Sequence, residues 1–293
     1  MKEIKTITTV LPTHNRCEHL RKLLVHLSNQ EPADYRLDII VIDDGSTDGT
    51  SKMLKEDFPF VHVVEGSGNW WYTRSVNEGF KIADNKNADF VLTMNDDCEI
   101  ESDYIKNLIS AVDLKEEGSI IGSISFSTAQ PRLLTFSGTR RIIKWRFKFI
   151  NYHPPFLKID PEELHGVHPS VLLPGRGMLI PMAVLRKLCY FDDNLLQYAS
   201  DYDFVLRAQE LGYKCYISWD ARIYENVHTT GTGTPHLEES WPIFFRSYFL
   251  PHSKNSLAKT WRFCSRHGLK FLFPVTFIIL ILGFLKKKAQ KKH

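Results

Sequence analysis

The strongest constraint on the fold is a regular alternation of strand and helix patterns through the first 112 residues. Segments with helical spacing follow short apolar, β-branched runs, and one of them places Leu20, Leu23, Leu24 and Leu27 on a single face. This order predicts an α/β fold with a mostly parallel sheet and helices on both faces. Ligands bind such sheets outside the carboxyl ends of the strands. The predicted strands are 6–12, 37–44, 60–65 and 88–94, and the predicted helices are 17–30, 45–57, 72–85 and 102–112.

The pattern is less regular from about residue 119 to residue 170. We expect strands at 119–127 and 214–219, a resumed core segment at 171–181 and a helix at 201–213 that Gly212 ends. Residues 132–156 are basic, aromatic and rich in β-forming residues, so they form either an edge hairpin or an insertion near an acceptor. Residues 225–236 are expected to form a loop.

The last 57 residues, 237–293, form an aromatic and basic extension that contains an apolar helix, 269–285. The apolar run is slightly shorter than the ~20 residues that cross a bilayer, and it contains Pro274. Basic residues flank it on both sides, and a single span would export one of these clusters against the usual orientation. We therefore favour attachment to a membrane surface over a true span or an ordinary buried helix.

Charge and cysteine content exclude several classes of protein. A formal charge of +3 is too small to indicate a nucleic-acid partner, so we expect none. The five cysteines include no C-x-x-C pair, which argues against a disulfide framework and a zinc site and favours a reducing compartment. The N-terminal residues show no signal-peptide pattern.

Acidic and polar clusters stand at the expected strand ends. They read PTHNR at 12–16, DDGS at 43–46 and NDD at 95–97, and a fourth cluster, SDYD at 200–203, opens a helix. Each alone is as well explained by helix capping. The four together favour a binding site at the carboxyl edge of the sheet.

With these motifs, the sequence resembles glycosyltransferase family 2, whose members have the GT-A fold. The resemblance covers about residues 5–235 and rests on TVLPTHNR, IIVIDDGSTDGT, GNWWYTRSVNEGF, FVLTMNDDCEI, GRGMLIP, FDDNLLQYASDYDFVLRAQELGYK and ENVH. Within the family, the chain is most similar to bacterial rhamnosyltransferase-like enzymes of cell-surface polysaccharides. The resemblance implies a GT-A domain at 1–236, with a nucleotide-sugar-binding half at 1–100 and an acceptor-binding half at 101–236.

The resemblance implies a divalent cation, Mg²⁺ or Mn²⁺, which suits carboxylate ligands and the phosphates of a sugar nucleotide. Asp97 matches the usual metal ligand of the family motif, and His228 matches a position that completes the site, although a surface-loop histidine is the plain alternative. Asn95 replaces the first acid of the motif and brings no charge. Asp96 can share either role.

The donor, a UDP- or dTDP-sugar, is expected to contact residues at several strand ends. The resemblance assigns its base and ribose to one of Asp43 and Asp44, with Asp44 favoured, and Arg74 suits the diphosphate because guanidinium groups pair well with phosphate. Trp70 and Trp71 either line the site or pack the core. The full set of expected donor contacts is Pro12, Thr13, Asn15, Arg16, Asp43, Asp44, Arg74, Asn77, Asn95 and Asp96.

The family places its catalytic base just before or within the start of a helix, and Asp201 occupies that position here, with helix capping as the alternative role. Helix geometry puts Asp203 on a different face, so the two acids should not share a role. Arg207 either faces the site or pairs with Asp203. Arg176 is a weaker candidate for contact with phosphate or acceptor.

The sequence thus predicts an inverting, metal-dependent transfer of a sugar to a hydroxyl of a glycan or lipid-linked glycan, in cell-surface polysaccharide or glycolipid synthesis. The expected location is cytoplasmic, on the inner face of the cell membrane. The rivals are a nucleotidyltransferase, whose Gly-rich basic loop is missing from PTHNR, and a non-catalytic nucleotide-sugar-binding protein. A dinucleotide-binding oxidoreductase lacks its G-x-G-x-x-G motif here.

Overall fold

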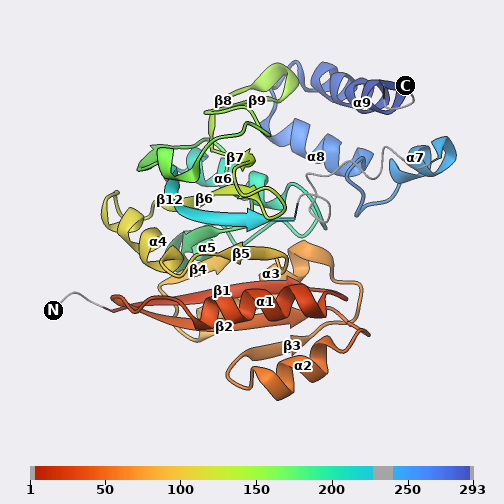
Figure 1. Ribbon diagram of the computed structural model, residues 1–293. Coiled ribbons are helices and arrows are strands. Elements are labelled where there is room, and N and C mark those ends of the chain that lie inside the picture. The colour runs from red at the N-terminus through yellow and green to blue at the C-terminus, as the bar shows by residue number, and fades with distance from the viewer. Residues whose placement is uncertain (1–3, 227–239, 291–293) are drawn as a thin grey trace.

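The computed structural model describes residues 4–226 and 240–290 (Figure 1). Its N-terminal half alternates strands and helices as the sequence predicts. Four of these strands form the parallel run β3-β2-β1-β4, in which β1 pairs with both β2 and β4. The elements are β1 (Lys5–Thr13), α1 (Cys17–Ser28), β2 (Tyr35–Asp43), α2 (Thr50–Asp57), β3 (His62–Glu65), α3 (Trp71–Asn85), β4 (Phe90–Thr93), β5 (Cys98–Ile100) and α4 (Tyr104–Asp113).

The second half extends the same sheet to ten strands and adds a small hairpin, β8–β9. The hairpin lies within 132–156, so of the two alternatives for that segment the structure has a hairpin. The elements are β6 (Ile120–Ser127), β7 (Leu134–Phe136), β8 (Thr139–Ile143), the 3₁₀ turn η1 (Lys144–Arg146), β9 (Lys148–Asn151), the 3₁₀ turn η2 (Pro161–Glu163), β10 (Val167–Pro169), β11 (Met178–Pro181), α5 (Met182–Lys187), α6 (Ser200–Glu210) and β12 (Cys215–Glu225).

The sheet is mixed, so the expectation of a mostly parallel sheet holds only for its N-terminal half. β11 runs antiparallel to both neighbours, β4 and β6. The chain reaches β11 across the carboxyl edge, where the Gly177 amide donates to the Thr93 carbonyl at 2.7 Å. A strand that starts at this edge must run opposite to β4. The approach also carries residues 174–176 over the strand ends.

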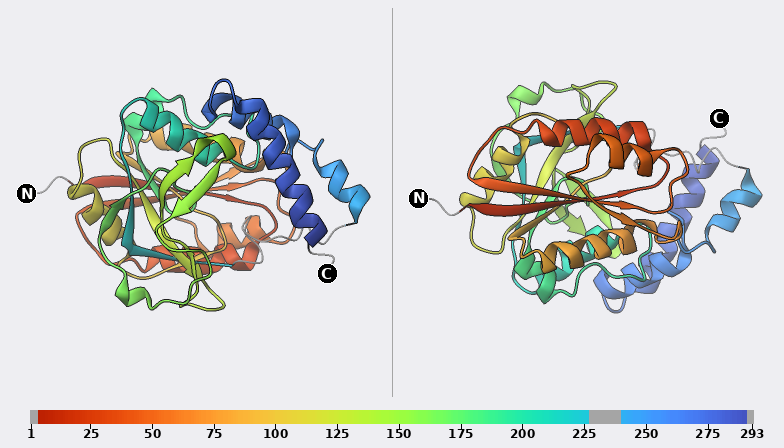
Figure 2. Two further views of the ribbon diagram at one scale, coloured as in Figure 1. Left: turned by 90° about the horizontal axis from the view of Figure 1, so that it is seen from above. Right: turned by 90° about the horizontal axis from the view of Figure 1, so that it is seen from below.

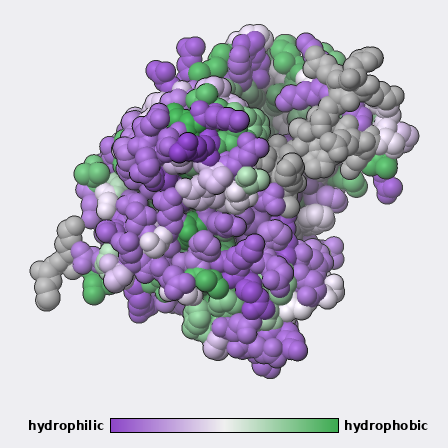
Figure 3. Space-filling model, in the orientation of Figure 1, coloured by the Kyte–Doolittle hydropathy of each residue, from purple (hydrophilic) through white to green (hydrophobic). Residues whose placement is uncertain are grey.

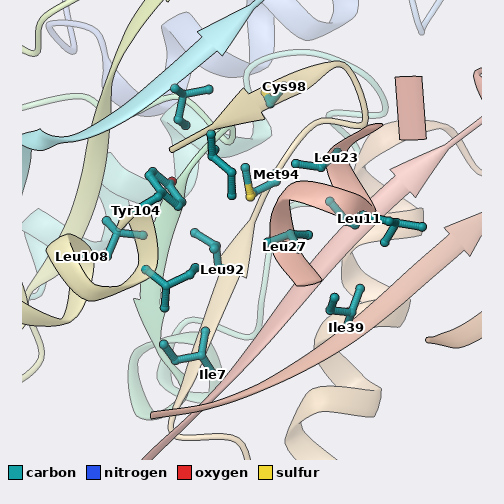
Figure 4. Packing of buried hydrophobic residues seen from close by; sticks show 14 of the residues in the cluster. Ile7, Leu11, Leu23, Leu27, Ile39, Leu92, Met94, Cys98, Tyr104 and Leu108 are labelled. Atoms are coloured by element: carbon teal, nitrogen blue, oxygen red, sulfur yellow. The ribbon is translucent and has the colours of Figure 1, made fainter. Parts of the chain in front are cut away.

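Two apolar layers cover the two faces of the sheet, as Figure 2 shows for the helices. On one face, α1, α2 and α4 pack on residues such as Ile7, Val41 and Leu92; Figure 4 shows part of this cluster, including Leu23, Leu27, Tyr104 and Leu108. On the other face, α3, α5 and α6 pack on the alternate residues of the same strands, among them Val10, Ile40 and Val91. Burial on both faces explains the apolar runs of β2 and β4 and the buried threonines Thr8 and Thr9 of β1, whose side chains are short.

The C-terminal segment, residues 240–290, contains the helices α7 (Trp241–Ser247), α8 (Leu257–His267) and α9 (Phe273–Gln290). One side of α9 packs against α8 and η1 through Phe277 and Leu280, and against α7 through Ile281 and Phe284. Among the described residues, none of the helices is both apolar enough and long enough for a bilayer crossing.

Candidate functional site

A cavity of about 670 Å³ opens at the carboxyl ends of β1, β2 and β4. The loops after β1, β2, β3 and β4 line it, together with the start of α3, residues 174–176, most of residues 197–202 and the C-terminal segment. The cavity therefore lies where ligands bind parallel sheets. The predicted site residues that line it are Pro12, Thr13, Arg16, Asp44, Asn95, Asp96, Asp97 and Asp201.

Asp96 and Asp97 are buried side by side below Arg16. The Arg16 Nη1 atom lies 3.1 Å from Asp96 Oδ1 and 2.8 Å from Asp97 Oδ2. The Thr13 hydroxyl donates to Asp96 Oδ2 at 2.8 Å. Burial raises the pKa of Asp96 to about 6, although Arg16 and Thr13 act in the opposite direction. This pair of carboxylates, held next to a guanidinium, forms the most charged part of the cavity floor.

Asp44 shapes a loop of the cavity wall. Its carboxylate accepts backbone N–H groups from Gly68 at 2.7 Å, from Trp70 at 2.8 Å and from Trp71 at 3.1 Å. Trp71 lines the cavity at the first residue of α3, and its ring stacks on that of His252, with centroids 4.0 Å apart. Asp44 thus fixes the position of the strand-end loop that follows β3.

Four of the expected donor contacts do not line the cavity, and three of them make hydrogen bonds within the scaffold. The Asn15 Oδ1 atom accepts from the Thr47 amide at 2.7 Å, and Asp43 accepts from the Ser46 amide at 3.0 Å and from the Ser51 hydroxyl at 2.6 Å.

The other two lie on α3. Asn77 is buried and donates to the Phe191 carbonyl at 3.0 Å and to Asp193 Oδ1 at 2.7 Å. The Arg74 guanidinium lies 4.9 Å from the Trp70 ring centroid.

Asp201 lies in the first turn of α6 with its carboxylate at the cavity. It accepts N–H groups from Gly175 at 2.8 Å and from Tyr202 at 2.9 Å. Burial raises the pKa of Asp201, and these two amides act against that shift. Gly175 must be glycine for this contact, because a Cβ there would lie 2.1 Å from the Tyr72 hydroxyl.

Asp203 points away from the cavity, as helix geometry predicts. Arg207 donates to its Oδ2 atom at 2.7 Å, so Arg207 pairs with Asp203. From α8, Arg266 Nη1 and His267 Nε2 approach the Oδ1 atom at 2.7 and 2.8 Å. Arg262 and Arg266 also contact Asp192 at 2.6 and 2.9 Å. These ion pairs hold α8 against the helix that carries Asp201.

A sequence model described as "Glycosyl transferase family 2" matches residues 8–170, more than half of the chain. The chain belongs to glycosyl transferase family 2. Asp201, Gly175 and the C-terminal segment lie beyond the matched residues, so the far wall of the cavity is formed by parts of the chain that the family match does not include.

Two curated relatives illustrate the similarity. The "Probable glycosyltransferase YdaM" of Bacillus subtilis is 25% identical over 223 residues, which are 73% of this chain and 49% of that protein. The "Undecaprenyl-phosphate 4-deoxy-4-formamido-L-arabinose transferase" of Pseudomonas syringae is 28% identical over 128 residues, 41% of this chain and 36% of that one. The chain thus spans about half, or less, of the length of these relatives.

Among solved structures, "GalNAc-T7 with UDP, GalNAc and Mn2+" superposes with a TM-score of 0.62 at 16% identity, over 93% of this chain and 56% of that one. The likeness supports the GT-A-like fold, a mixed α/β structure with a central sheet between helices. It confirms the GT-A-like α/β fold of the prediction, whereas a membrane-associating role of the C-terminal extension stays a prediction.

The described residues offer few ligands for a divalent cation. Within 4–226 and 240–290, no group of three or more His, Cys, Asp and Glu side chains is arranged to hold a metal ion. Asp97 and Asp96 supply two adjacent carboxylates, and Mg²⁺-type ions commonly bind one or two carboxylates plus substrate phosphates. His228 lies outside the described residues.

The cavity also contains residues that sequence reasoning missed. The Tyr72 hydroxyl is buried at the cavity, and burial, followed by the charge of Asp201, raises its pKa well above the usual value. Arg176, which the sequence had already suggested for contact with phosphate or acceptor, lines the wall and pairs with buried Glu225 at 2.9 Å. Lys254, Lys259 and Phe284 come from the C-terminal segment. Only the basic and aromatic composition of that segment hinted at such a role.

Proposed function

We propose that this protein is an inverting glycosyltransferase that moves a sugar from a UDP- or dTDP-sugar to a hydroxyl of an acceptor. One observation carries the proposal: Asp96 and Asp97, at the end of β4, line the same cavity as Asp201 at the start of α6. A single displacement at an anomeric carbon requires a base for the acceptor hydroxyl and a means to stabilise the leaving diphosphate. Asp201 is the candidate base, and Asp96 and Asp97 are a carboxylate pair that could hold the stabilising cation.

In the proposed reaction, the acceptor oxygen attacks the anomeric carbon while the bond to the diphosphate breaks. Asp201 takes the proton of the hydroxyl, and its raised pKa makes it a better proton acceptor at neutral pH than a solvated aspartate. Asp97, with Asp96, would hold Mg²⁺ or Mn²⁺. The cation would stabilise the charge of the leaving diphosphate. The Mn²⁺ in the GalNAc-T7 structure supports this assignment by analogy.

The proposed acceptor is a glycan or a lipid-linked glycan at the inner face of the cell membrane. The support is the outer side of the C-terminal segment, where Phe271 is 95% exposed, Ile278 55% and Leu282 57%. Figure 3 shows separate hydrophobic patches among hydrophilic residues at the top of the view, where α9 lies in Figure 1. Lys286 and Lys287 follow this face and suit anionic headgroups. The name of the Pseudomonas relative includes a lipid phosphate.

Transfer assays on Asp201→Asn and Asp97→Ala test the reaction, with exposed Asp34→Asn as the matched control. We expect the Asp201 variant to lose a factor of about 10² to 10⁴ in kcat while it still binds the nucleotide. Wild-type rates in both variants would exclude the mechanism. If the wild type binds the nucleotide sugar but transfers no sugar, and the variants lose that binding, the result would instead favour a non-catalytic nucleotide-sugar-binding protein.

Vesicle co-sedimentation tests the membrane surface. Phe271→Asp with Ile278→Asp should release the protein from vesicles of phosphatidylcholine and phosphatidylglycerol, because both side chains are exposed on one segment. Phe60→Asp, at a 61% exposed phenylalanine between α2 and β3, is the control. Equal sedimentation of both variants would remove the support for this surface.

A further inference from the structure

Two lysines of the C-terminal segment face into the cavity. Lys254 precedes α8, and Lys259 lies in its first turn, where the Ser256 hydroxyl accepts from the Lys259 amide. Phe284 of α9 lines the cavity beside them. The segment therefore contributes charged groups to the site, in addition to the apolar surface on its outer side.

The two lysines are in contact and are both half-buried. Lys259 Nζ donates to the Lys254 carbonyl at 2.5 Å, and it lies 5.7 Å from the ring centroid of Tyr198. Burial and the charge of Lys254 lower the pKa of Lys259 to about 8, so it still carries a proton at neutral pH. Among the described residues, Lys259 forms no ion pair with an Asp or a Glu. A half-buried ammonium group that lines the cavity and has no carboxylate partner among the described residues favours the binding of an anion.

The two lysines line the same cavity as the acidic residues Asp96 and Asp97. Tyr198 lines the same cavity and contacts Lys259, and the charge of Arg16 opposes the burial that raises the Tyr198 pKa. Asp96 and Asp97 already pair with Arg16, so the lysines add further positive charge to the cavity lining. The ion pairs of Arg262, Arg266 and His267 hold α8 in this place.

We propose that Lys254 and Lys259 bind a phosphate or diphosphate group, so that the C-terminal segment completes the site. An ammonium group is a compact, mobile charge that suits phosphate oxygens. The inference rests on the proposed function only for the source of the phosphate, which is either the diphosphate of the donor or a phosphate of the lipid acceptor.

Isothermal titration of the full chain with inorganic pyrophosphate tests the binding site directly. Lys259→Met should weaken binding about tenfold, the usual effect of one hydrogen bond to a charged group. Lys259→Arg, which keeps the charge, should restore most of it. Lys270→Met, at an exposed lysine of the same segment, is the control and should bind as the wild type does. If the Lys259→Met protein unfolds, Lys259→Arg and Lys254→Met carry the comparison.

Two further titrations identify the source. Loss of affinity for UDP with unchanged affinity for UMP assigns the lysines to the donor diphosphate. Loss of binding to phosphatidylcholine vesicles that contain a polyprenyl phosphate, with UDP binding unchanged, assigns them to the acceptor. Pyrophosphate, UDP and vesicle binding that all equal the wild-type values overturn the proposal.

The binding results also separate this inference from the proposed function. If the protein transfers no sugar but Lys259→Met weakens pyrophosphate binding, the anion site is supported and the proposed function fails. If the protein transfers sugar and Lys259→Met leaves the KM unchanged, the proposed function is supported and the anion site fails.

Discussion

Replacement of Asp203 by Asn should release the C-terminal segment from the helix that carries the proposed base. The Asp203 side chain is 1% exposed, and its two oxygens contact Arg207, Arg266 and His267. Burial tends to raise the pKa of Asp203, but the hydrogen bonds from these three residues outweigh it and lower the pKa. The carboxylate is therefore favoured in the folded protein.

The size of the effect follows from the burial of the partners. Removal of one member of a buried ion pair costs about 3 to 5 kcal/mol. The side chain of Arg266 is 32% exposed and that of Arg207 is 19% exposed, and Arg266 keeps Asp192, so we expect a loss of about 3 kcal/mol. For a chain of this size, that loss lowers the melting temperature by roughly 6 to 12 °C.

Thermal melts and limited proteolysis measure this change. Asp203→Asn should melt earlier than the wild type and expose residues 240–290 to cleavage, with a raised KM as the cavity wall loosens. Asp201→Asn, two residues away on the same helix, should lose transfer but keep the melting temperature within a few degrees, because its charge is unfavourably buried. A wild-type melt and cleavage pattern for Asp203→Asn would refute the anchoring role.

Three other predictions follow from the same contacts. Gly175→Ala should lower kcat at least tenfold and stability by about 1 to 3 kcal/mol, since its Cβ would overlap the Tyr72 hydroxyl; steady-state kinetics and melts test this, and unchanged kinetics would contradict it. Glu225→Gln should destabilise the protein by about 3 kcal/mol in a denaturant melt, because it leaves Arg176 buried beside a neutral group. The melting temperature should fall as the pH drops below about 4. The pKa of Asp203 is lower in the folded protein than its unfolded value of 3.8, so its stabilisation is complete above that value and is lost as the carboxylate protonates. Asp203→Asn should show a smaller fall.

The local patterns of the sequence were sufficient for the parallel half of the sheet. The runs that became β1, β2 and β4 are apolar or β-branched, and the leucines of α1 repeat at helical spacing, so each element is specified by its own residues. The acidic ends of these strands then met at one edge because parallel strands share it. The antiparallel entry of β11 depends on the path of a long connection, which no local pattern encodes.

The site was predictable to the extent that its residues directly follow strands. Asp44, Asp96 and Asp97 reach the cavity because a strand end fixes them there. Asn77 and Arg74 were expected at the donor from their place in a motif, but side-chain partners brought together by tertiary packing, such as Phe191, decide where they point. Lys259 follows no strand and belongs to no motif, so only the folded chain reveals it.

The cavity joins residues from near the two ends of the chain, and this has a consequence for the order of folding. Thr13 and Arg16 come from the first strand and its loop, whereas Lys259 and Phe284 come from the last two helices. Contacts between such distant residues close a very long loop and form late, after the local strand–helix units. During synthesis, the sheet and its acidic edge can assemble before α8 leaves the ribosome. A nascent chain would thus have the acidic edge of the sheet before it has a closed pocket.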